Sequence, residues 1–162
     1  MMDDTLRQAA SALLDAFRAR GLLLATAESC TGGLIAAALT EIAGSSDVVN
    51  RGFVTYSNAA KTEMLGVPAE MIASYGAVSE RVARAMAEGA LQRSGAAVSI
   101  AVTGIAGPGG GSAEKPVGTV WFGCALRDGA TITQRHVFPG DRAAIRRATV
   151  LQGFELIRSA VG

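Results

Sequence analysis

The first quarter of the chain carries a helical stripe of apolar residues, then a short apolar run, then an Ala-rich stripe. Residues 4–20 have the spacing of an amphipathic helix. The run Leu22–Ala25 predicts a buried strand, and residues 34–44 predict a buried helix of about a dozen residues. Polar and small residues at 26–33 therefore fall at a strand-to-helix turn, where open α/β proteins place ligands.

The rest of the chain continues this alternation and ends in a hairpin. Further strands are predicted at 48–57, 97–102, 117–126 and 131–138. Further helices are predicted at 59–65 with Asn58 as N-cap, in a short piece opened by Pro68, from Ser79 to about residue 94, and after a cap at Asp141. Five strands and four or five helices predict an α/β fold with a mainly parallel sheet, one antiparallel strand and helices on both faces.

Composition narrows the class of protein. We expect residues 1–162 to form one domain with a substantial core. A net charge of +1 gives no reason to expect nucleic-acid binding, and no apolar run is long enough for a membrane span. The polar, acidic N-terminus argues against a signal peptide. The sequence therefore predicts a cytoplasmic protein with no nucleic-acid or membrane partner.

A few reactive side chains stand out because their types are rare. Cys30 and Cys124 lack metal-site spacing and are expected to be reduced thiols. The single histidine, His136, excludes multi-histidine metal sites. Lys61 and Lys115 are the only lysines beside thirteen arginines, and lysine can lose its proton whereas arginine practically cannot.

Three polar clusters follow predicted strands, at 26–33, 55–61 and 103–112. The carboxyl ends of parallel strands share one edge of a sheet. We therefore expect side chains from all three clusters to converge there, namely Ser29, Tyr56, Lys61, Thr103 and the glycine loop that begins at Gly104.

Ser29 is a candidate nucleophile that needs a base, because an unactivated hydroxyl reacts poorly. A neutral lysine can replace histidine in that role, and burial favours the neutral form, so Lys61 is the candidate base. Tyr56 could relay a proton or orient the amine. The residues alone leave the alternative open that Ser29 is only a helix N-cap and Lys61 a solvated lysine.

Other side chains have open alternatives at this stage. Cys30 is either an activated thiol or, more commonly, a small buried residue. His136 alternates within a predicted strand, which favours a structural role. Residues 104–111 either wrap a phosphate or sugar or form a plain loop. Arg142 is either an anion ligand or surface charge, and Glu28 either binds substrate or satisfies backbone N–H groups.

Several motifs together resemble one known family. The matching stretches are Ala27-Glu28-Ser29-Cys30-Thr31-Gly32-Gly33, Arg51-Gly52-Phe53-Val54-Thr55-Tyr56-Ser57-Asn58, Gly76-Ala77-Val78-Ser79, Gly104-Ile105-Ala106-Gly107-Pro108-Gly109-Gly110 and Lys115-Pro116-Val117-Gly118-Thr119-Val120. Their order and content resemble the CinA C-terminal domain family over nearly the whole chain. Members of that family are nicotinamide-nucleotide amidases, also called nicotinamide mononucleotide deamidases.

The resemblance implies a fold, a reaction and a set of site residues. The fold would be a three-layer α/β/α sandwich with a five-stranded mixed sheet, in the stand-alone form without the additional N-terminal domain of longer CinA proteins. The reaction would convert nicotinamide mononucleotide and water to nicotinic acid mononucleotide and ammonia, for pyridine-nucleotide recycling. Ser29 would be the nucleophile and Lys61 the base. Supporting residues by motif match would be Tyr56, Ser46, Thr103, Gly104, Arg142, Thr31 and Gly32.

The resemblance implies no metal or cofactor, and the small size leaves a homodimer open. Two rival hypotheses remain at this stage. The chain could be a nucleotide-binding regulatory module without activity, or a thiol hydrolase that uses Cys30.

Overall fold

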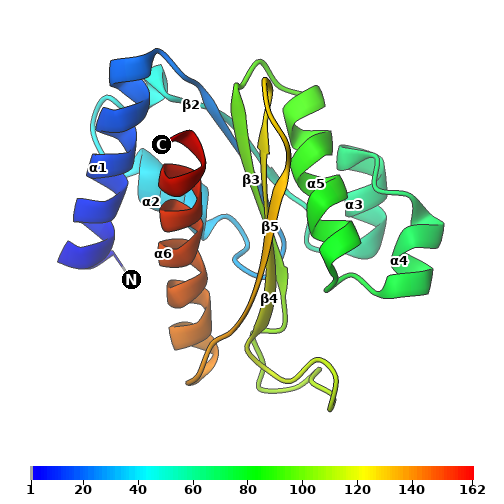
Figure 1. Cartoon of the computed structure of the whole chain (residues 1–162). Coiled ribbons are helices and arrows are strands. Elements are labelled where there is room, and N and C mark those ends of the chain that lie inside the picture. Colours follow the sequence, from blue (N-terminus) through cyan, green and yellow to red (C-terminus); the bar gives the residue numbers. More distant parts are fainter. Residues whose placement is uncertain (1) are drawn as a thin grey trace.

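A five-stranded sheet lies between two layers of helices in the computed structural model, which describes residues 2–162 (Figure 1). The strands are β1 (Leu24–Glu28), β2 (Val49–Val54), β3 (Val98–Gly104), β4 (Thr119–Leu126) and β5 (Ile132–Val137). The helices are α1 (Asp4–Arg20), α2 (Leu34–Thr40), α3 (Asn58–Leu65), α4 (Ala69–Tyr75), α5 (Glu80–Gln92) and α6 (Arg142–Val161), with a 3₁₀ turn η1 at Ser45–Asp47.

The sheet has the order β2-β1-β3-β4-β5. Strand β1 pairs in parallel with both β2 and β3, whereas β4 is antiparallel to both β3 and β5. Four strands therefore run one way and β4 runs against them, which confirms the predicted α/β fold with a mostly parallel sheet and one antiparallel strand.

Each face of the sheet has its own hydrophobic core. The core under α1, α2 and α6 contains Phe17, Ile35, Phe122 and Phe154. The core under α3, α4 and α5 is smaller and includes Leu65 and Met86. Figure 1 shows these two groups of helices on opposite sides of the sheet. The central strands β1, β3 and β4 lie between the cores and are buried along almost their whole length, whereas the edge strands β2 and β5 are largely exposed or half-buried.

Element boundaries differ from the sequence prediction in physically explicable ways. Strand β1 begins at Leu24 and extends to Glu28, because its partners continue to Val54 on β2 and Val102 on β3. Helix α2 ends at Thr40, four residues before Gly44, because the following turns use i→i−3 hydrogen bonds instead of helical ones.

Helix α3 is capped one residue earlier than predicted. The Ser57 hydroxyl, rather than the side chain of Asn58, accepts the hydrogen bond from the Ala60 N–H at 3.0 Å. Within residues 2–162 six α-helices form, against the count of four or five predicted, and the short piece expected after Pro68 is the helix α4. Among residues 2–162, no helix combines the length and the apolar character needed to cross a membrane.

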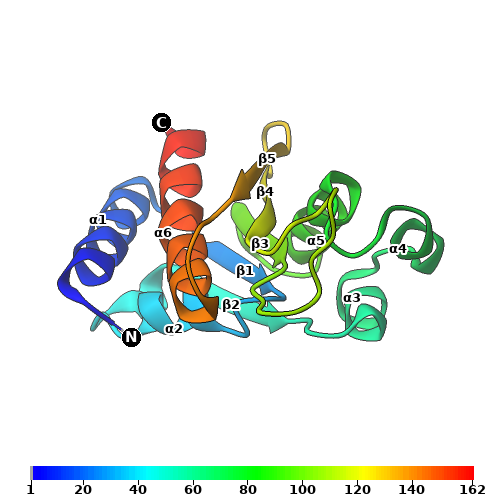
Figure 2. The same ribbon diagram turned by 90° about the horizontal axis from the view of Figure 1, so that it is seen from below.

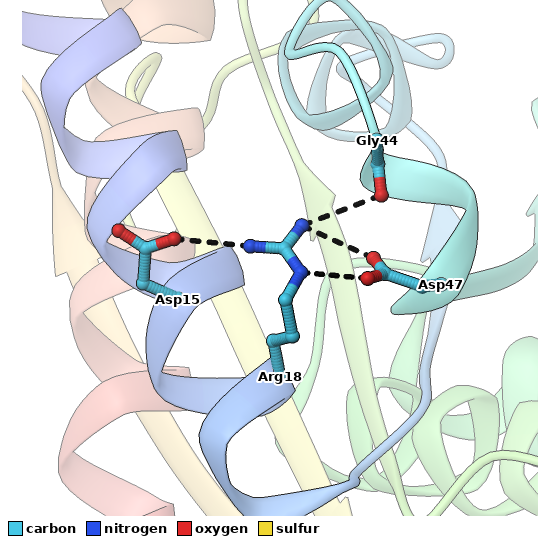
Figure 3. Close-up of polar contacts among 4 residues, drawn as sticks. All are labelled: Asp15, Arg18, Gly44 and Asp47. Carbon is cyan, nitrogen blue, oxygen red and sulfur yellow. Dashed lines mark hydrogen bonds and ion pairs between the residues drawn. The ribbon is translucent and has the colours of Figure 1, made fainter.

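The turn η1 is fixed at the end of the sheet where the parallel strands begin. Arg18, near the C-terminal end of α1, donates from Nε to Asp47 at 2.6 Å and from Nη1 to Asp15 at 3.0 Å (Figure 3). The same guanidinium donates to the Gly44 carbonyl at 3.3 Å. These contacts join α1 to the turn that leads into β2.

The opposite edge collects the carboxyl ends of β1, β2, β3 and β5. Figure 2 shows the molecule from this side, with residues 105–118 looping beside the ends of the strands. The N-terminus of α6 and the turn between β1 and α2 lie at the same edge. This edge therefore brings together the three polar clusters that the sequence singles out.

Candidate active site

Ser29 is the first residue after β1. Its N–H donates to the Val102 carbonyl of β3 at 3.1 Å, and its carbonyl accepts from the Gly32 N–H at 3.0 Å. Gly32 and Gly33 have φ angles of 58° and 107°, a region that glycine adopts without strain, and they turn the chain into α2. Ser29 is thereby held at the strand end with 8% of its surface exposed.

Lys61 reaches Ser29 from α3. Its Nζ lies 2.9 Å from Ser29 Oγ, although 32 residues separate the two in sequence. Nζ also donates to the carbonyl of Thr55 at 3.0 Å and to that of Ser57 at 3.5 Å. Ser57 also begins the helix that carries Lys61, so the helix start and the amine position are fixed together.

The surroundings of Lys61 favour a neutral amine. The side chain is 1% exposed, and burial lowers its pKa from the usual value by removing water from the charged form. Within residues 2–162, no ion pair joins Lys61 to a carboxylate. A neutral amine has two N–H donors and one lone pair, which match two carbonyl acceptors and one serine hydroxyl. This arrangement can accept the proton of Ser29.

Cys30 is unsuited to the role of nucleophile. The thiol is buried, and burial raises its pKa to about 11, so it stays protonated at neutral pH. Its position after Ser29 places it in the core shared with α1, α2 and α6. Of the two adjacent candidates, the serine alone contacts a base.

Glu28 acquires a clear structural role that the sequence left open. Its side chain is buried, and Oε1 accepts from the Thr31 hydroxyl at 2.6 Å and from the Ile35 N–H at 2.8 Å. Oε2 accepts from the Ala36 N–H at 3.0 Å. The carboxylate thus satisfies amides at the start of α2, as a helix N-terminus requires, and also holds the Thr31 side chain.

Tyr56 and Arg142 lie at the outer part of this edge. Tyr56 is 62% exposed, and its hydroxyl accepts from Arg142 Nη2 at 3.2 Å. Arg142 Nη1 donates to the Gly107 carbonyl at 2.8 Å. Tyr56 has no hydrogen bond to Lys61 or Ser29. The pair instead links the β2–α3 connection, the glycine loop and the first residue of α6.

Thr103 and Gly104 end β3 at the same edge. The Thr103 hydroxyl donates to the Ala77 carbonyl at 2.9 Å, which fixes the segment before α5. Thr103 is buried, and the space around Gly104 is closed by Val120 and the backbone of β4. The structure therefore brings Thr103, Gly104, Thr31 and Gly32 to the edge that holds Ser29.

Ser46 is the one expected site residue that lies elsewhere. It belongs to η1, which precedes β2, whereas Ser29 follows the strand that runs parallel to β2. The two serines are therefore at opposite ends of the sheet, separated by about five residues of strand or roughly 17 Å. The contribution of Ser46 to the site stays a prediction, and this placement does not favour it, because η1 lies at the amino end of β2 and Ser29 lies at the carboxyl end of β1.

Arg146 is a residue of this site that the sequence prediction missed. From α6, its Nε donates to the Cys30 carbonyl and its Nη2 to the Thr31 carbonyl, both at 3.2 Å. Arg146 lies one helical turn after Arg142, so the i, i+4 spacing of two arginines on α6 is the signal that could have indicated it. In the described part of the chain, no three metal-ligating side chains cluster in a way that could hold a metal ion.

Comparisons with known proteins agree with the motif resemblance. A family model described as the CinA C-terminal domain matches residues 6–161. The chain is 60% identical over 131 residues to Nicotinamide-nucleotide amidohydrolase PncC from Enterobacter agglomerans, with 81% of this chain and 80% of that protein covered. It is 54% identical over 147 residues to the protein of the same name from Escherichia coli K12, with 91% and 89% covered.

A solved structure gives the same result for the fold. The crystal structure of competence/damage inducible protein CihA from Agrobacterium tumefaciens superposes with a TM-score of 0.98 at 50% identity, with 100% of this chain and 99% of that chain covered. The motifs, the fold and the sequence similarity coincide over almost the full length of the chain, and the protein belongs to the CinA C-terminal domain family.

Proposed function

We propose that this protein hydrolyses the carboxamide of nicotinamide mononucleotide, giving nicotinic acid mononucleotide and ammonia in pyridine-nucleotide recycling. The observation that carries this proposal is the 2.9 Å contact between Ser29 Oγ and a buried Lys61 Nζ at the carboxyl edge of the sheet. Two relatives of high identity are named for an amidohydrolase that acts on a nicotinamide nucleotide. A serine with a lysine base is suited to acyl transfer from an amide.

The proposed mechanism has two stages. Lys61 takes the hydroxyl proton while Ser29 Oγ bonds to the carboxamide carbon, and an oxyanion forms. The C–N bond then breaks, and the ammonium group of Lys61 returns the proton to the leaving nitrogen, which departs as ammonia. In the second stage water attacks the acyl-serine and Lys61 takes the water proton. The C–Oγ bond then breaks, Lys61 returns that proton to Ser29 Oγ, and the acid product is released with Ser29 and neutral Lys61 restored.

The substrate's charge suits this site. The pyridinium ring of nicotinamide mononucleotide is a cation next to the carboxamide, so it disfavours a second positive charge on Lys61 and supports the neutral base. At the outer edge, Arg142 is the proposed counter-charge for the phosphate, and Tyr56 lies beside it. Thr31, Gly32, Thr103 and Gly104 are proposed to line the space next to Ser29.

Incubation of the protein with nicotinamide mononucleotide, with ammonia as the measured product, tests this function. We expect ammonia release that Ser29→Ala abolishes and Cys30→Ala retains. Loss in Cys30→Ala with normal turnover in Ser29→Ala would instead support a thiol hydrolase. Tight nucleotide binding without ammonia release would show a binding module rather than an enzyme.

A further inference from the structure

Within the described residues, three backbone amides of the turn between β1 and α2 find no acceptor in another residue. These are the N–H groups of Cys30, Thr31 and Gly33, of which Cys30 and Thr31 belong to buried residues and Gly33 to a half-buried one. Buried amides are nearly always paired, so two consecutive unpaired donors next to a nucleophile need an explanation. A developing oxyanion on Ser29 would supply an acceptor for them.

The peptide groups that contain the Cys30 and Thr31 N–H are each held by a hydrogen bond to their carbonyl oxygen. In a planar trans peptide, the C=O and the N–H point in opposite directions. The Ser29 carbonyl is held by the Gly32 N–H, which sets the direction of the Cys30 N–H. The Cys30 carbonyl is held by Arg146 Nε, which sets the direction of the Thr31 N–H and polarises that peptide with a cationic donor.

Glu28 fixes the same turn from the face of β1 that α2 covers. Side chains alternate along a strand, so Glu28 and Ser29 project to opposite faces, and Glu28 turns towards α2 while Ser29 turns towards Lys61. The carboxylate binds the Thr31 hydroxyl inside the turn and two amides of α2 beyond it. The turn is therefore held between an anion of β1 and a cation of α6.

We propose that Glu28 and Arg146 are positioning residues that aim the N–H groups of Cys30 and Thr31 at the oxyanion formed on Ser29. This inference rests on the proposed amidase function and deepens it. Neither side chain hydrogen-bonds to Ser29 Oγ or Lys61 Nζ, and both act through the backbone of residues 29–33.

Conservative variants test this role. Glu28→Gln keeps one oxygen acceptor but places an amide where the Ala36 N–H needs an acceptor. Arg146→Lys keeps the charge but cannot bind two carbonyls as a planar guanidinium does. Matched controls are Glu41→Gln and Arg147→Lys, whose native side chains form exposed pairs with Arg7 and Asp3.

We expect kcat to fall about 10- to 100-fold in Glu28→Gln and in Arg146→Lys, somewhat less than the loss of a whole oxyanion donor. KM should stay within about twofold, because the interaction forms only in the transition state. The double variant should lose less than the product of the two single losses, since both residues act on one turn. The controls should keep wild-type kcat.

A purely structural role would give a different pattern. If the melting temperature fell in both variants while the kcat of the folded fraction stayed at the wild-type value, the positioning role would be wrong. Equal rises in KM with unchanged kcat would also refute it.

Phosphonylation of Ser29 by a fluorophosphonate, followed by mass spectrometry, separates this inference from the identity of the substrate. In that reaction Ser29 Oγ bonds to phosphorus while Lys61 takes the hydroxyl proton, fluoride leaves, and the phosphoryl oxygen occupies the oxyanion position. If the wild type released no ammonia from nicotinamide mononucleotide but its Ser29 reacted, and both variants reacted about tenfold more slowly, the substrate would be wrong and the positioning role would stand. Equal labelling rates in wild type and variants, or no labelling of wild-type Ser29, would overturn the positioning role itself.

Discussion

Replacement of Lys61 by methionine tests whether the Lys61 amine is the general base and is neutral in the folded protein, because the variant keeps the length of the side chain and removes the amine. A positioned general base contributes about 10²- to 10⁴-fold to a rate, so we expect kcat to fall by about three orders of magnitude. That loss corresponds to about 4 kcal/mol in the activation free energy. The activity loss alone does not show that the amine is neutral, and a second measurement on the same variant does.

The second measurement is the pH dependence of stability. Burial lowers the pKa of Lys61 in the folded protein, while in the unfolded chain it is about 10.5. Between those two values the unfolded chain binds one proton more than the folded protein, so the free energy of unfolding rises with pH. The slope reaches at most about 1.4 kcal/mol per pH unit where the proton difference is complete. Lys61→Met has no such proton, so this slope is absent.

Denaturant unfolding of both proteins between pH 6 and pH 10.5 provides the assay, with the difference between their free energies of unfolding as the measured quantity. Burial also raises the pKa values of Cys30 and Cys124. The effect of Cys124 is common to both proteins and cancels in the difference, whereas the pKa of Cys30 depends partly on the charge of Lys61, so both proteins carry Cys30→Ala in this assay. We expect the protein that keeps Lys61 to gain stability relative to Lys61→Met as pH rises towards 10.5. A flat difference would show that folded Lys61 keeps its ordinary pKa, and the neutral-base mechanism would fail.

Three further predictions concern packing and the limits of the site. A Cβ at Gly89 would overlap the Leu65 carbonyl oxygen of α3. We therefore expect Gly89→Ala to lower the free energy of unfolding by about 2 kcal/mol or more and to reduce kcat. Gly109→Ala is the control, because the space around its new Cβ is open, and it should match the wild type in both denaturation and turnover. Ser46→Ala should leave kcat and KM for nicotinamide mononucleotide unchanged, and a loss above about tenfold would show that Ser46 reaches the site after all. Burial raises the pKa of the Cys124 thiol to about 12, so a thiol reagent at pH 8 should modify it only after denaturant is added, and rapid modification of the native protein would contradict its burial.

The sequence predicted the elements well where hydrophobic periodicity was strong. Helix α1 has the predicted bounds, because its apolar stripe is regular and a glycine follows its last turn. The end of α2 was harder to predict, since alanine-rich sequence favours a helix for longer than this one continues. Its last residue is decided by 3₁₀ turns that connect it to η1, and these depend on tertiary contacts such as those of Arg18.

The location of the site could also be predicted from the sequence, but the hydrogen-bond contacts between its side chains could not. A strand-to-helix turn pointed to Ser29, and the parallel sheet explained why Lys61 should lie near it. The contact between them depends on how α3 packs, which local spacing does not encode. Glu28 remained ambiguous for a similar reason, because its acceptors are amides of a helix whose start is fixed only in the folded chain.

The hydrogen bond between Lys61 and Ser29 joins groups that depend on different cores. Lys61 lies on α3, which packs into the core with α4 and α5, whereas the turn after Ser29 leads into α2 and the core shared with α1 and α6. Substitutions in the two cores are far enough apart to add in their effects on stability. Substitutions in either core change turnover through the same distance, that between Ser29 Oγ and Lys61 Nζ, so their effects on turnover should not add. Evolution of this enzyme would therefore show epistasis in catalytic rate between positions whose effects on folding stability are independent. A substitution in one helical layer that lowers the catalytic rate could be compensated by a second substitution in the other layer.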